Sequence, residues 1–263
     1  MPTDAMRRGD FTGLAEDYSR YRTGYAPSVL AALLGLFSRP PAELDAVDVG
    51  AGTGIWTRCL ADAGFRSVTA VEPNADMRRA GIRDSVGRSI VWREGSGEHT
   101  GLPDVSADVL CMASSFHWVD LGLGLREFHR VLRPDGWFVA LWSTRLLECT
   151  PVLQALEDEL RNLQPDLRRS AFGPASRTDG LTDRLADASG FDDVIALEGR
   201  HTTLQSPDHY LGNWRSTNDV RHRMGEAKFA AFLQRAETRL AGFDSLEVTY
   251  ATRAWAVRRT AAD

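Results

Sequence analysis

A short apolar run meets a glycine-rich turn early in the chain, in Val47-Asp48-Val49-Gly50-Ala51-Gly52-Thr53-Gly54. Glycine takes up positive φ angles at little steric cost, so this pattern predicts a buried strand that turns sharply into a helix. The helix is expected over residues 55–63, where Gly64 closes it. A strand joined to a helix in this way is the first unit of an open α/β sheet.

The same alternation of strands and helices continues to about residue 162. Further strands are predicted at residues 67–72, 90–93, 107–113 and 137–142, and helices begin at residues 75 and 122. Residues 133–136, Arg-Pro-Asp-Gly, predict a turn by their composition. Because strands alternate with helices, we expect parallel pairing through right-handed crossovers, in a doubly wound sheet.

The pattern changes after residue 162. Residues 163–180 are expected to form a loop, followed by a helix at 181–188 and a strand at 194–203. Ser206-Pro207-Asp208 resembles a helix start, so helices are predicted at 207–216 and 226–240, with a strand at 246–257. The last two strands are expected at the far edge of the same sheet, with the two helices as an insertion over one end.

Composition narrows the possible partners and settings. The 263 residues are 43% hydrophobic and carry a net charge of −5, so a nucleic-acid partner is not expected. We find no apolar run of about 18 residues and expect no membrane association. The three cysteines lack CxxC spacing and Asp120 has no partner carboxylates, so the sequence predicts a cytoplasmic protein without a metal.

The glycine turn alone leaves two classes of nucleotide open. Its G-x-G-x-G spacing puts Ile55 where the nicotinamide pattern G-x-G-x-x-G has its third glycine. Glu72, at the end of the second strand, suits ribose hydroxyls in either class. Asp48 favours a methionine-containing nucleotide, because a carboxylate inside a strand is costly unless it is paired, for example with an ammonium group. The polar residues 95–98 after the third strand can bracket an adenine edge.

Several segments, taken together, resemble the class I S-adenosylmethionine-dependent methyltransferases, in particular the small-molecule group with a type 11 methyltransferase domain. They are Asp48–Gly54, Val71-Glu72-Pro73 with Met77, residues 95–103, Ser114-Ser115-Phe116-His117-Trp118 and residues 127–136. They follow the family's order and span roughly residues 10–145.

This resemblance implies a seven-stranded sheet in the order 3-2-1-4-5-7-6 with the last strand antiparallel. It also implies an N-terminal lid helix and a helical insertion near the C-terminus. We expect a single domain over residues 1–263. Residues 1–44 would form the lid and N-terminal helices, residues 45–162 the cofactor-binding core, and residues 163–263 the remaining sheet edge and the acceptor-side helices.

The resemblance further assigns residues to S-adenosylmethionine. The methionine portion is expected against Asp48 and the loop of Gly50, Ala51, Gly52, Thr53 and Gly54. Adenosine would be held by residues from the next two strand ends: Glu72 at the ribose, Pro73 and Met77 beside adenine, Ser96 and Gly97 at its edge, and Glu98 as a further polar contact or a helix or turn cap. Ala113, at the end of the fourth strand, would lie near the sulfur, and Tyr18 of the lid would face the sulfonium.

The acceptor is expected on the other side of the sulfur. His117 is a candidate general base, or a side chain that only shapes the pocket. Further contacts to the acceptor are predicted at Tyr21, Trp118, Trp142 and Trp214, with Tyr210 and Arg215 as weaker candidates in the helical region. The charge of Arg215 hints at an anionic acceptor.

The expected reaction is transfer of a methyl group from S-adenosylmethionine to an oxygen or nitrogen atom of a small molecule, with secondary metabolites among the candidate acceptors. Two alternatives stay open: a methyltransferase-fold binding module without catalysis, and a nicotinamide oxidoreductase. A monomer or a homodimer is expected.

Overall fold

Seven strands form one sheet in the order β3-β2-β1-β4-β5-β7-β6 in a computed structural model, which describes residues 13–165, 167, 178–192 and 194–260. The strands are β1 Asp45–Val49, β2 Ser67–Val71, β3 Ile90–Arg93, β4 Ala107–Ala113, β5 Leu132–Arg145, β6 Ile195–Gln205 and β7 Leu246–Arg258. The first five pair in parallel, and β7 runs antiparallel to both β5 and β6. This confirms the predicted order and the antiparallel last strand.

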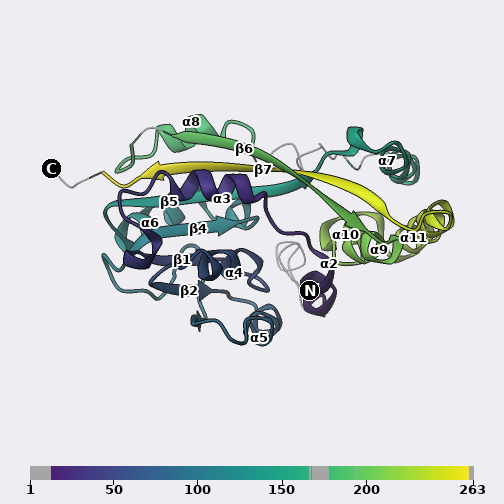
Figure 1. The fold of residues 1–263 in the computed structure, drawn as a ribbon. Helices are drawn as coiled ribbons and strands as arrows, with labels where there is room; N and C mark the ends of the chain where they lie inside the picture. The colour runs from purple at the N-terminus through teal and green to yellow at the C-terminus, as the bar shows by residue number, and fades with distance from the viewer. Residues whose placement is uncertain (1–12, 166, 168–177, 193, 261–263) are drawn as a thin grey trace, which may run out of the picture.

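Along the chain, most helices of the described residues connect one strand to the next, and in space they flank the sheet (Figure 1). They are α2 Ala15–Tyr21, α3 Pro27–Leu34, α4 Ile55–Asp62, α5 Ala75–Asp84, α6 Leu121–Val131, α7 Pro151–Leu163, α8 Leu181–Ala186, α9 Pro207–Arg215, α10 Asn218–Met224 and α11 Glu226–Leu240, with short 3₁₀ turns η1 Pro41–Glu43, η2 Phe116–Trp118 and η3 Leu147–Cys149.

Side-chain caps fix several helix starts. The Asn74 side chain accepts hydrogen bonds from the first backbone N–H groups of α5, and the Asp120 side chain accepts from the N–H of Leu123 in α6. Ser206 accepts from the N–H of His209, which confirms the helix start predicted there. Such caps satisfy backbone donors that a helix leaves unpaired.

Two layers of helices cover the sheet. On one face, α3 and α4 bury Leu33, Trp56 and Leu60 against the apolar residues of β1, β4 and β5. On the other face, α6 and α8 bury Phe128 and Leu185. The chain is therefore a three-layer α/β/α structure, as expected for a doubly wound sheet.

A third cluster of buried residues lies beyond one end of the sheet. Helices α7, α9, α10 and α11, here called the helical lobe, pack together around Tyr210, Trp214 and Phe232. Strands β5 and β7 extend from the sheet toward this lobe, which Figure 1 shows at the end of the molecule opposite the C-terminus. This agrees with the predicted helical insertion over one end of the sheet.

The structure differs from the sequence prediction in three places. Helices α7 and α10 were not predicted as elements. The turn predicted at residues 133–136 lies instead within the start of β5, where the register with β4 shifts and Asp135 has a φ of +63°. Most of the loop predicted at residues 163–180 lies outside the described residues, and so do residues 1–12 of the predicted N-terminal lid segment.

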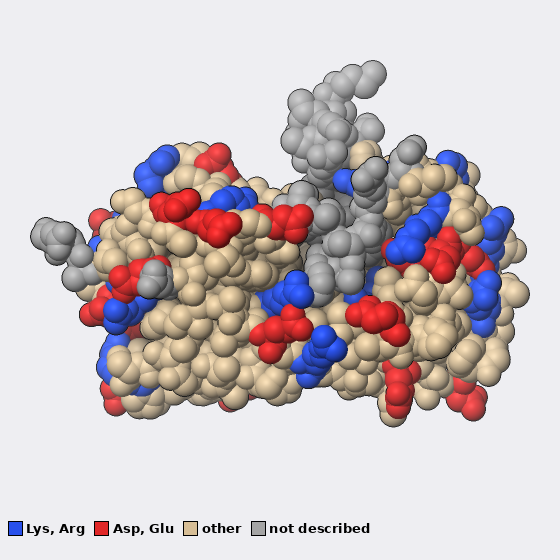
Figure 2. Space-filling view, turned by 90° about the horizontal axis from the view of Figure 1, so that it is seen from above, with Lys and Arg blue, Asp and Glu red and all other residues tan. Residues whose placement is uncertain are grey.

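The described surface carries charge of both signs. On the face in Figure 2, basic and acidic side chains are interspersed rather than gathered by sign. In the part of the chain that the structure describes, we find no helix with the length and apolar character needed to cross a membrane.

A buried carboxylate joins β4 to its neighbours at the end of the sheet where β4 begins. Asp108 is 5% exposed and accepts hydrogen bonds from the Asp45 backbone N–H at 2.8 Å and from Arg133 at 2.6 Å. Arg39 also forms an ion pair with it at 2.5 Å.

We expect Asp108→Ala to lower the free energy of unfolding by about 3 kcal/mol, because it leaves a partly buried N–H and two arginines without their shared acceptor. Urea unfolding followed by circular dichroism measures the loss. Asp104→Ala is the control, since Asp104 is 73% exposed and pairs only at the surface with Arg130, so its loss should stay below about 1 kcal/mol. Equal effects of the two variants would contradict the role assigned to Asp108.

Candidate functional site

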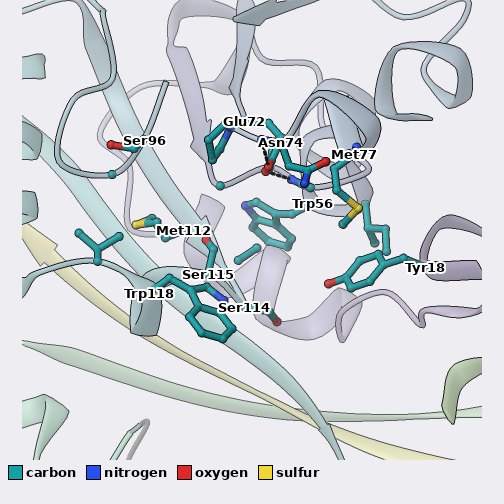
Figure 3. Close-up of a pocket in the computed structure, with 18 of the residues that line it drawn as sticks. Tyr18, Trp56, Glu72, Asn74, Met77, Ser96, Met112, Ser114, Ser115 and Trp118 are labelled. Atoms are coloured by element: carbon teal, nitrogen blue, oxygen red, sulfur yellow. Dashed lines mark hydrogen bonds between the residues drawn. The ribbon is translucent and has the colours of Figure 1, made fainter. Parts of the chain in front are cut away.

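A cavity of about 330 Å³ opens at the carboxyl ends of the parallel strands (Figure 3). This is the edge at which open α/β sheets bind ligands. Its lining combines small, polar and aromatic residues: Tyr18, Tyr25, Gly50, Ala51, Gly52, Ile55, Trp56, Glu72, Pro73, Asn74, Met77, Ser96, Gly97, Glu98, Met112, Ala113, Ser114, Ser115, Trp118 and Val119. The structure thus brings together twelve of the residues predicted from sequence.

The glycine turn forms one wall of the cavity. Gly50, Gly52 and Gly54 all have positive φ, at +65°, +58° and +78°. A Cβ atom on Gly50 would lie 2.7 Å from the Cβ of Ser115, so no larger residue fits without displacing the loop after β4. The backbone is therefore exposed to the cavity at close range, as in nucleotide-binding turns.

Glu72 ties this turn to the end of β2. It is 6% exposed, and its carboxylate accepts hydrogen bonds from the backbone N–H of Gly52 at 2.7 Å and of Asn74 at 2.8 Å. Burial raises the pKa of Glu72 above its usual range, although the two backbone donors oppose the shift. Figure 3 shows Glu72 and Asn74 side by side at the cavity.

The loop after β3 closes another side. Ser96 donates its hydroxyl to Glu98 at 3.0 Å, and the other carboxylate oxygen of Glu98 accepts from the Asp120 backbone N–H at 3.0 Å. A Cβ on Gly97 would lie 2.3 Å from the Cγ2 of Val119, so glycine is required for this loop to pack against the start of α6. Glu98 therefore joins two loops as well as lining the cavity.

The end of β4 contributes a strained, polar corner. Ser114 has a φ of +59°, unusual for a residue with a side chain, and its N–H donates to the carbonyl of Leu141 at 2.7 Å. Its hydroxyl lies 3.2 Å from the hydroxyl of Tyr25. Ser115 donates to the carbonyl of Val49 at 3.0 Å. Strained positions of this kind concentrate at functional sites.

Aromatic and sulfur-containing side chains supply the apolar part of the cavity. Tyr18 from α2 and Met77 from α5 lie near each other, and Trp56 lies near the middle of the view in Figure 3. The Tyr25 ring meets that of Trp56 edge-on, with centroids 5.1 Å apart. Burial raises the pKa of Tyr25 well above its usual range, so its hydroxyl stays protonated at neutral pH.

Asp48 lies behind the glycine turn and is not among the lining residues. It is fully buried, and Thr57 donates its hydroxyl to one carboxylate oxygen at 2.6 Å. The other oxygen has no hydrogen-bond partner in the described part of the chain. Burial raises the pKa of Asp48 to about 7, and the charge of Glu72 adds to this while Thr57 opposes it.

Six other predicted site residues do not line the cavity: Thr53, Gly54, Tyr21, His117, Trp142 and Trp214. Thr53 is fully buried and Gly54 packs beneath the Trp92 ring. Tyr21 contacts α9 instead, through an edge-on approach to His209. Trp214 is fully buried in the helical lobe against Phe232.

His117 lies just outside the cavity, in η2. Its Nδ1 accepts a hydrogen bond from the indole N–H of Trp142 at 3.3 Å, which requires Nδ1 to be unprotonated. Its ring lies 4.6 Å from the ring of Trp118, which does line the cavity. Trp142 is 5% exposed and belongs to the sheet core.

The structure adds lining residues to which the sequence had assigned no role: Tyr25, Ile55, Trp56, Asn74, Met112, Ser114, Ser115 and Val119. Ser114 and Ser115 belong to a segment that carried the resemblance, so their motif was a usable signal. Tyr25 lies on the segment between α2 and α3, and only the fold brings it to β4. Among the described residues, no three His, Cys, Asp or Glu side chains are grouped as metal ligands would be.

Comparison with known proteins gives a consistent result. Residues 47–140 match a family described as a methyltransferase domain. The chain is 36% identical over 128 residues to an uncharacterised methyltransferase of Mycobacterium tuberculosis, and the match covers 49% of each chain. It is 38% identical over 104 residues to a ubiquinone/menaquinone biosynthesis C-methyltransferase of Rubrivivax gelatinosus, covering 39% of this chain and 40% of that one.

The chain thus spans about half the length of the curated relatives it matches. A solved structure extends the likeness to the whole fold. A proposed type II methyltransferase from Anaeromyxobacter dehalogenans superimposes with a TM-score of 0.64 at 25% identity, covering 92% of this chain and 100% of that one.

Proposed function

We propose that this chain transfers a methyl group from S-adenosylmethionine to an oxygen or nitrogen atom of a small molecule, because residues 47–140 match the methyltransferase-domain family. The observation that carries the proposal is the bond network of Glu72, which couples the glycine turn to the end of β2 inside the cavity. A carboxylate at that place suits a ribose, because its remaining lone pairs can accept from two hydroxyls.

The cavity fits such a donor in size and chemistry. Its volume of about 330 Å³ falls within the range of ligand sites. Pro73 and Met77 offer apolar surfaces to the adenine ring, and Ser96 and Gly97 lie where they can contact its polar edge. The glycine turn offers backbone N–H groups to the methionine portion. Ala113, at the end of β4, would lie beside the sulfur.

The bound donor supplies an electrophilic methyl group on a cationic sulfur. The role of this chain is to orient the acceptor for in-line attack and to exclude water, effects that can account for much of a rate enhancement. The rings of Tyr18 and Tyr25 suit a cationic group, to which aromatic faces are attracted. The hydroxyls of Tyr25 and Ser114 can hydrogen-bond an acceptor O–H or N–H at the end of β4.

We assign His117 to positioning rather than to proton transfer. Its ring packs on Trp118, and its Nδ1 is held by Trp142, so it fixes one wall of the cavity. Carbon is the second candidate acceptor atom, since one relative carries the name C-methyltransferase.

Titration calorimetry tests which nucleotide the cavity binds. We expect S-adenosylmethionine and S-adenosylhomocysteine to bind with micromolar dissociation constants, and NADH not to bind. Binding of NADH alone would favour a nicotinamide oxidoreductase. Binding of S-adenosylmethionine without turnover of any acceptor, in a screen with labelled methyl groups, would favour a binding module without catalysis.

A further inference from the structure

An arginine beside the helical lobe carries a charge that the donor site does not use. Arg145 is the last residue of β5, and because side chains alternate along a strand it shares a face of β5 with Ser143 and Leu141. The Leu141 carbonyl holds the N–H of Ser114 in the cavity. Arg145 therefore lies about 13 Å further along the strand from the point where the methyl group would be delivered.

Aromatic rings surround the Arg145 guanidinium. Its central carbon lies 4.5 Å from the ring centroid of Trp214 and 5.3 Å from that of Tyr210, and both rings are fully buried. Its neighbour on β7 is Tyr250. Nη1 of Arg145 is buried and has no hydrogen-bond partner among the described residues. Burial lowers the pKa of Arg145, but Tyr210, Tyr250 and Glu157 more than offset this, so the group stays charged.

Other arginines close to this region are already paired. Arg215, which the sequence suggested for an anionic acceptor, binds Asp208 at 3.0 Å. Arg22 donates to the Ser216 hydroxyl and carbonyl at 3.0 and 3.1 Å. Arg145 differs because a buried donor of its guanidinium is left unsatisfied, which is costly unless a ligand completes it.

A polar cluster continues from Arg145 toward the donor cavity. The Tyr250 hydroxyl accepts from the side-chain amides of Gln205 at 3.1 Å and Asn213 at 3.4 Å. Gln205 also donates to Thr23 at 3.2 Å, and its own side-chain oxygen is buried without a partner in the described residues. Thr23 lies on the segment between α2 and α3 that carries Tyr25 into the donor cavity.

The sheet face closes the same path. The Ala26 backbone N–H donates to Thr252 at 2.8 Å, and the Thr252 hydroxyl lies 3.4 Å from that of Ser143. Residues 22–26 thus lie over the face of β5 and β7 that runs from Ser114 to Arg145. Ser114 and Arg145 therefore lie toward opposite ends of one sheet face, and each end carries polar groups.

We propose that Arg145 binds an anionic group, a carboxylate, of the methyl acceptor, so that the acceptor is a small organic acid held with its other end at Ser114 and Tyr25. The proposal rests on the proposed function and adds its substrate class. A guanidinium is well suited to this task, because its donors match the two oxygens of a carboxylate. Glu157 of α7 is an acidic residue in the same region, and its charge raises the pKa of Arg145.

Labelled-methyl transfer to fractionated metabolites tests this inference. A small-molecule extract is separated into anionic, cationic and neutral fractions by ion exchange, and each is incubated with S-adenosylmethionine and the protein. We expect label in the anionic fraction. With the acceptor from that fraction, Arg145→Met should raise KM about 100-fold with a smaller change in kcat, and Arg145→Lys should recover part of the loss.

Arg221→Met is the control, since it removes a surface arginine of the helical lobe that is paired with Glu226, and it should leave KM within about 3-fold. S-adenosylhomocysteine affinity should be unchanged in all three variants, which checks that they fold. Label only in the neutral or cationic fractions, or an unchanged KM for Arg145→Met, would overturn the inference while leaving methyl transfer intact. Absence of label from every fraction would instead count against the proposed function.

Discussion

Replacing Glu72 with alanine is expected to weaken S-adenosylmethionine binding roughly 1,000-fold. The carboxylate holds two backbone N–H groups, of Gly52 and Asn74, and would also accept from the ribose. Hydrogen bonds to charged groups contribute about 1.5–3 kcal/mol each, so losing two gives a change of this size. Titration calorimetry with S-adenosylmethionine and S-adenosylhomocysteine measures it.

Two variants make this result specific. Glu72→Gln keeps one acceptor oxygen but loses the charge, so its affinity should fall between those of the alanine variant and the native protein. Glu226→Ala removes a glutamate that is 74% exposed in the helical lobe and should leave the affinity unchanged. Near-native affinity of Glu72→Ala, in a protein with unaltered circular dichroism, would rule out the ribose role.

The ligand-free protein is expected to carry a stability penalty from Asp48 that grows with pH. Its pKa is about 7 in the folded state, against about 4 when unfolded, so the folded state binds the proton more tightly between these values. The unfolding free energy therefore falls as pH rises through that window, and the full penalty above pH 7 is roughly 4 kcal/mol. Asp48→Asn removes it.

Urea unfolding of the native protein and of Asp48→Asn at pH 5 and pH 8 measures this penalty as the difference between their unfolding free energies. The stability of Asp48→Asn relative to the native protein should rise by roughly 2–3 kcal/mol between the two values. Asp62→Asn is the control, because Arg88 lowers the pKa of that exposed aspartate and it does not titrate in this range. A constant difference between Asp48→Asn and the native protein would show that Asp48 is ionised throughout.

The same variant tests whether Asp48 faces the methionine ammonium group of the donor. If it does, binding of S-adenosylhomocysteine should tighten between pH 6 and pH 8 in the native protein, as the carboxylate ionises, and not in Asp48→Asn. If the affinity is independent of pH in both the native protein and Asp48→Asn, the ammonium group binds elsewhere. Asp48 lies behind the residues that line the cavity, so this experiment decides between the two placements.

Much of the donor half could be predicted from sequence because its signals are local. A buried strand, a glycine turn and a carboxylate at the end of the next strand lie within 26 residues, from Val47 to Glu72. Each can be predicted from its own conformational or electrostatic requirements, without knowledge of a distant partner. The strand order followed from the family resemblance, and the structure reproduces it.

The acceptor half could not be predicted in the same way. Trp142 and Trp214 were predicted as acceptor contacts, but both are buried in the protein interior. Periodicity alone does not distinguish an aromatic side chain that lines a pocket from one in the core. Tyr25 and Arg145 were missed because their surroundings come from segments far apart in the chain: Tyr25 meets Ser114, and Arg145 meets Tyr210. Such contacts depend on how β5 and β7 extend past the end of the donor cavity.

That extension links the two halves during unfolding as well. Strand β7 contributes Leu246 and Val248 to the helical lobe and Trp255 and Val257 to the sheet core without interruption. Local unfolding of the helical lobe would therefore weaken the pairing of β7 with β5, and β5 in turn pairs with β4 at the cavity. Substitutions that adapt the helical lobe to a new acceptor and destabilise it would therefore also destabilise the donor site. The number of acceptors that this fold can be adapted to is limited by the stability that both parts share.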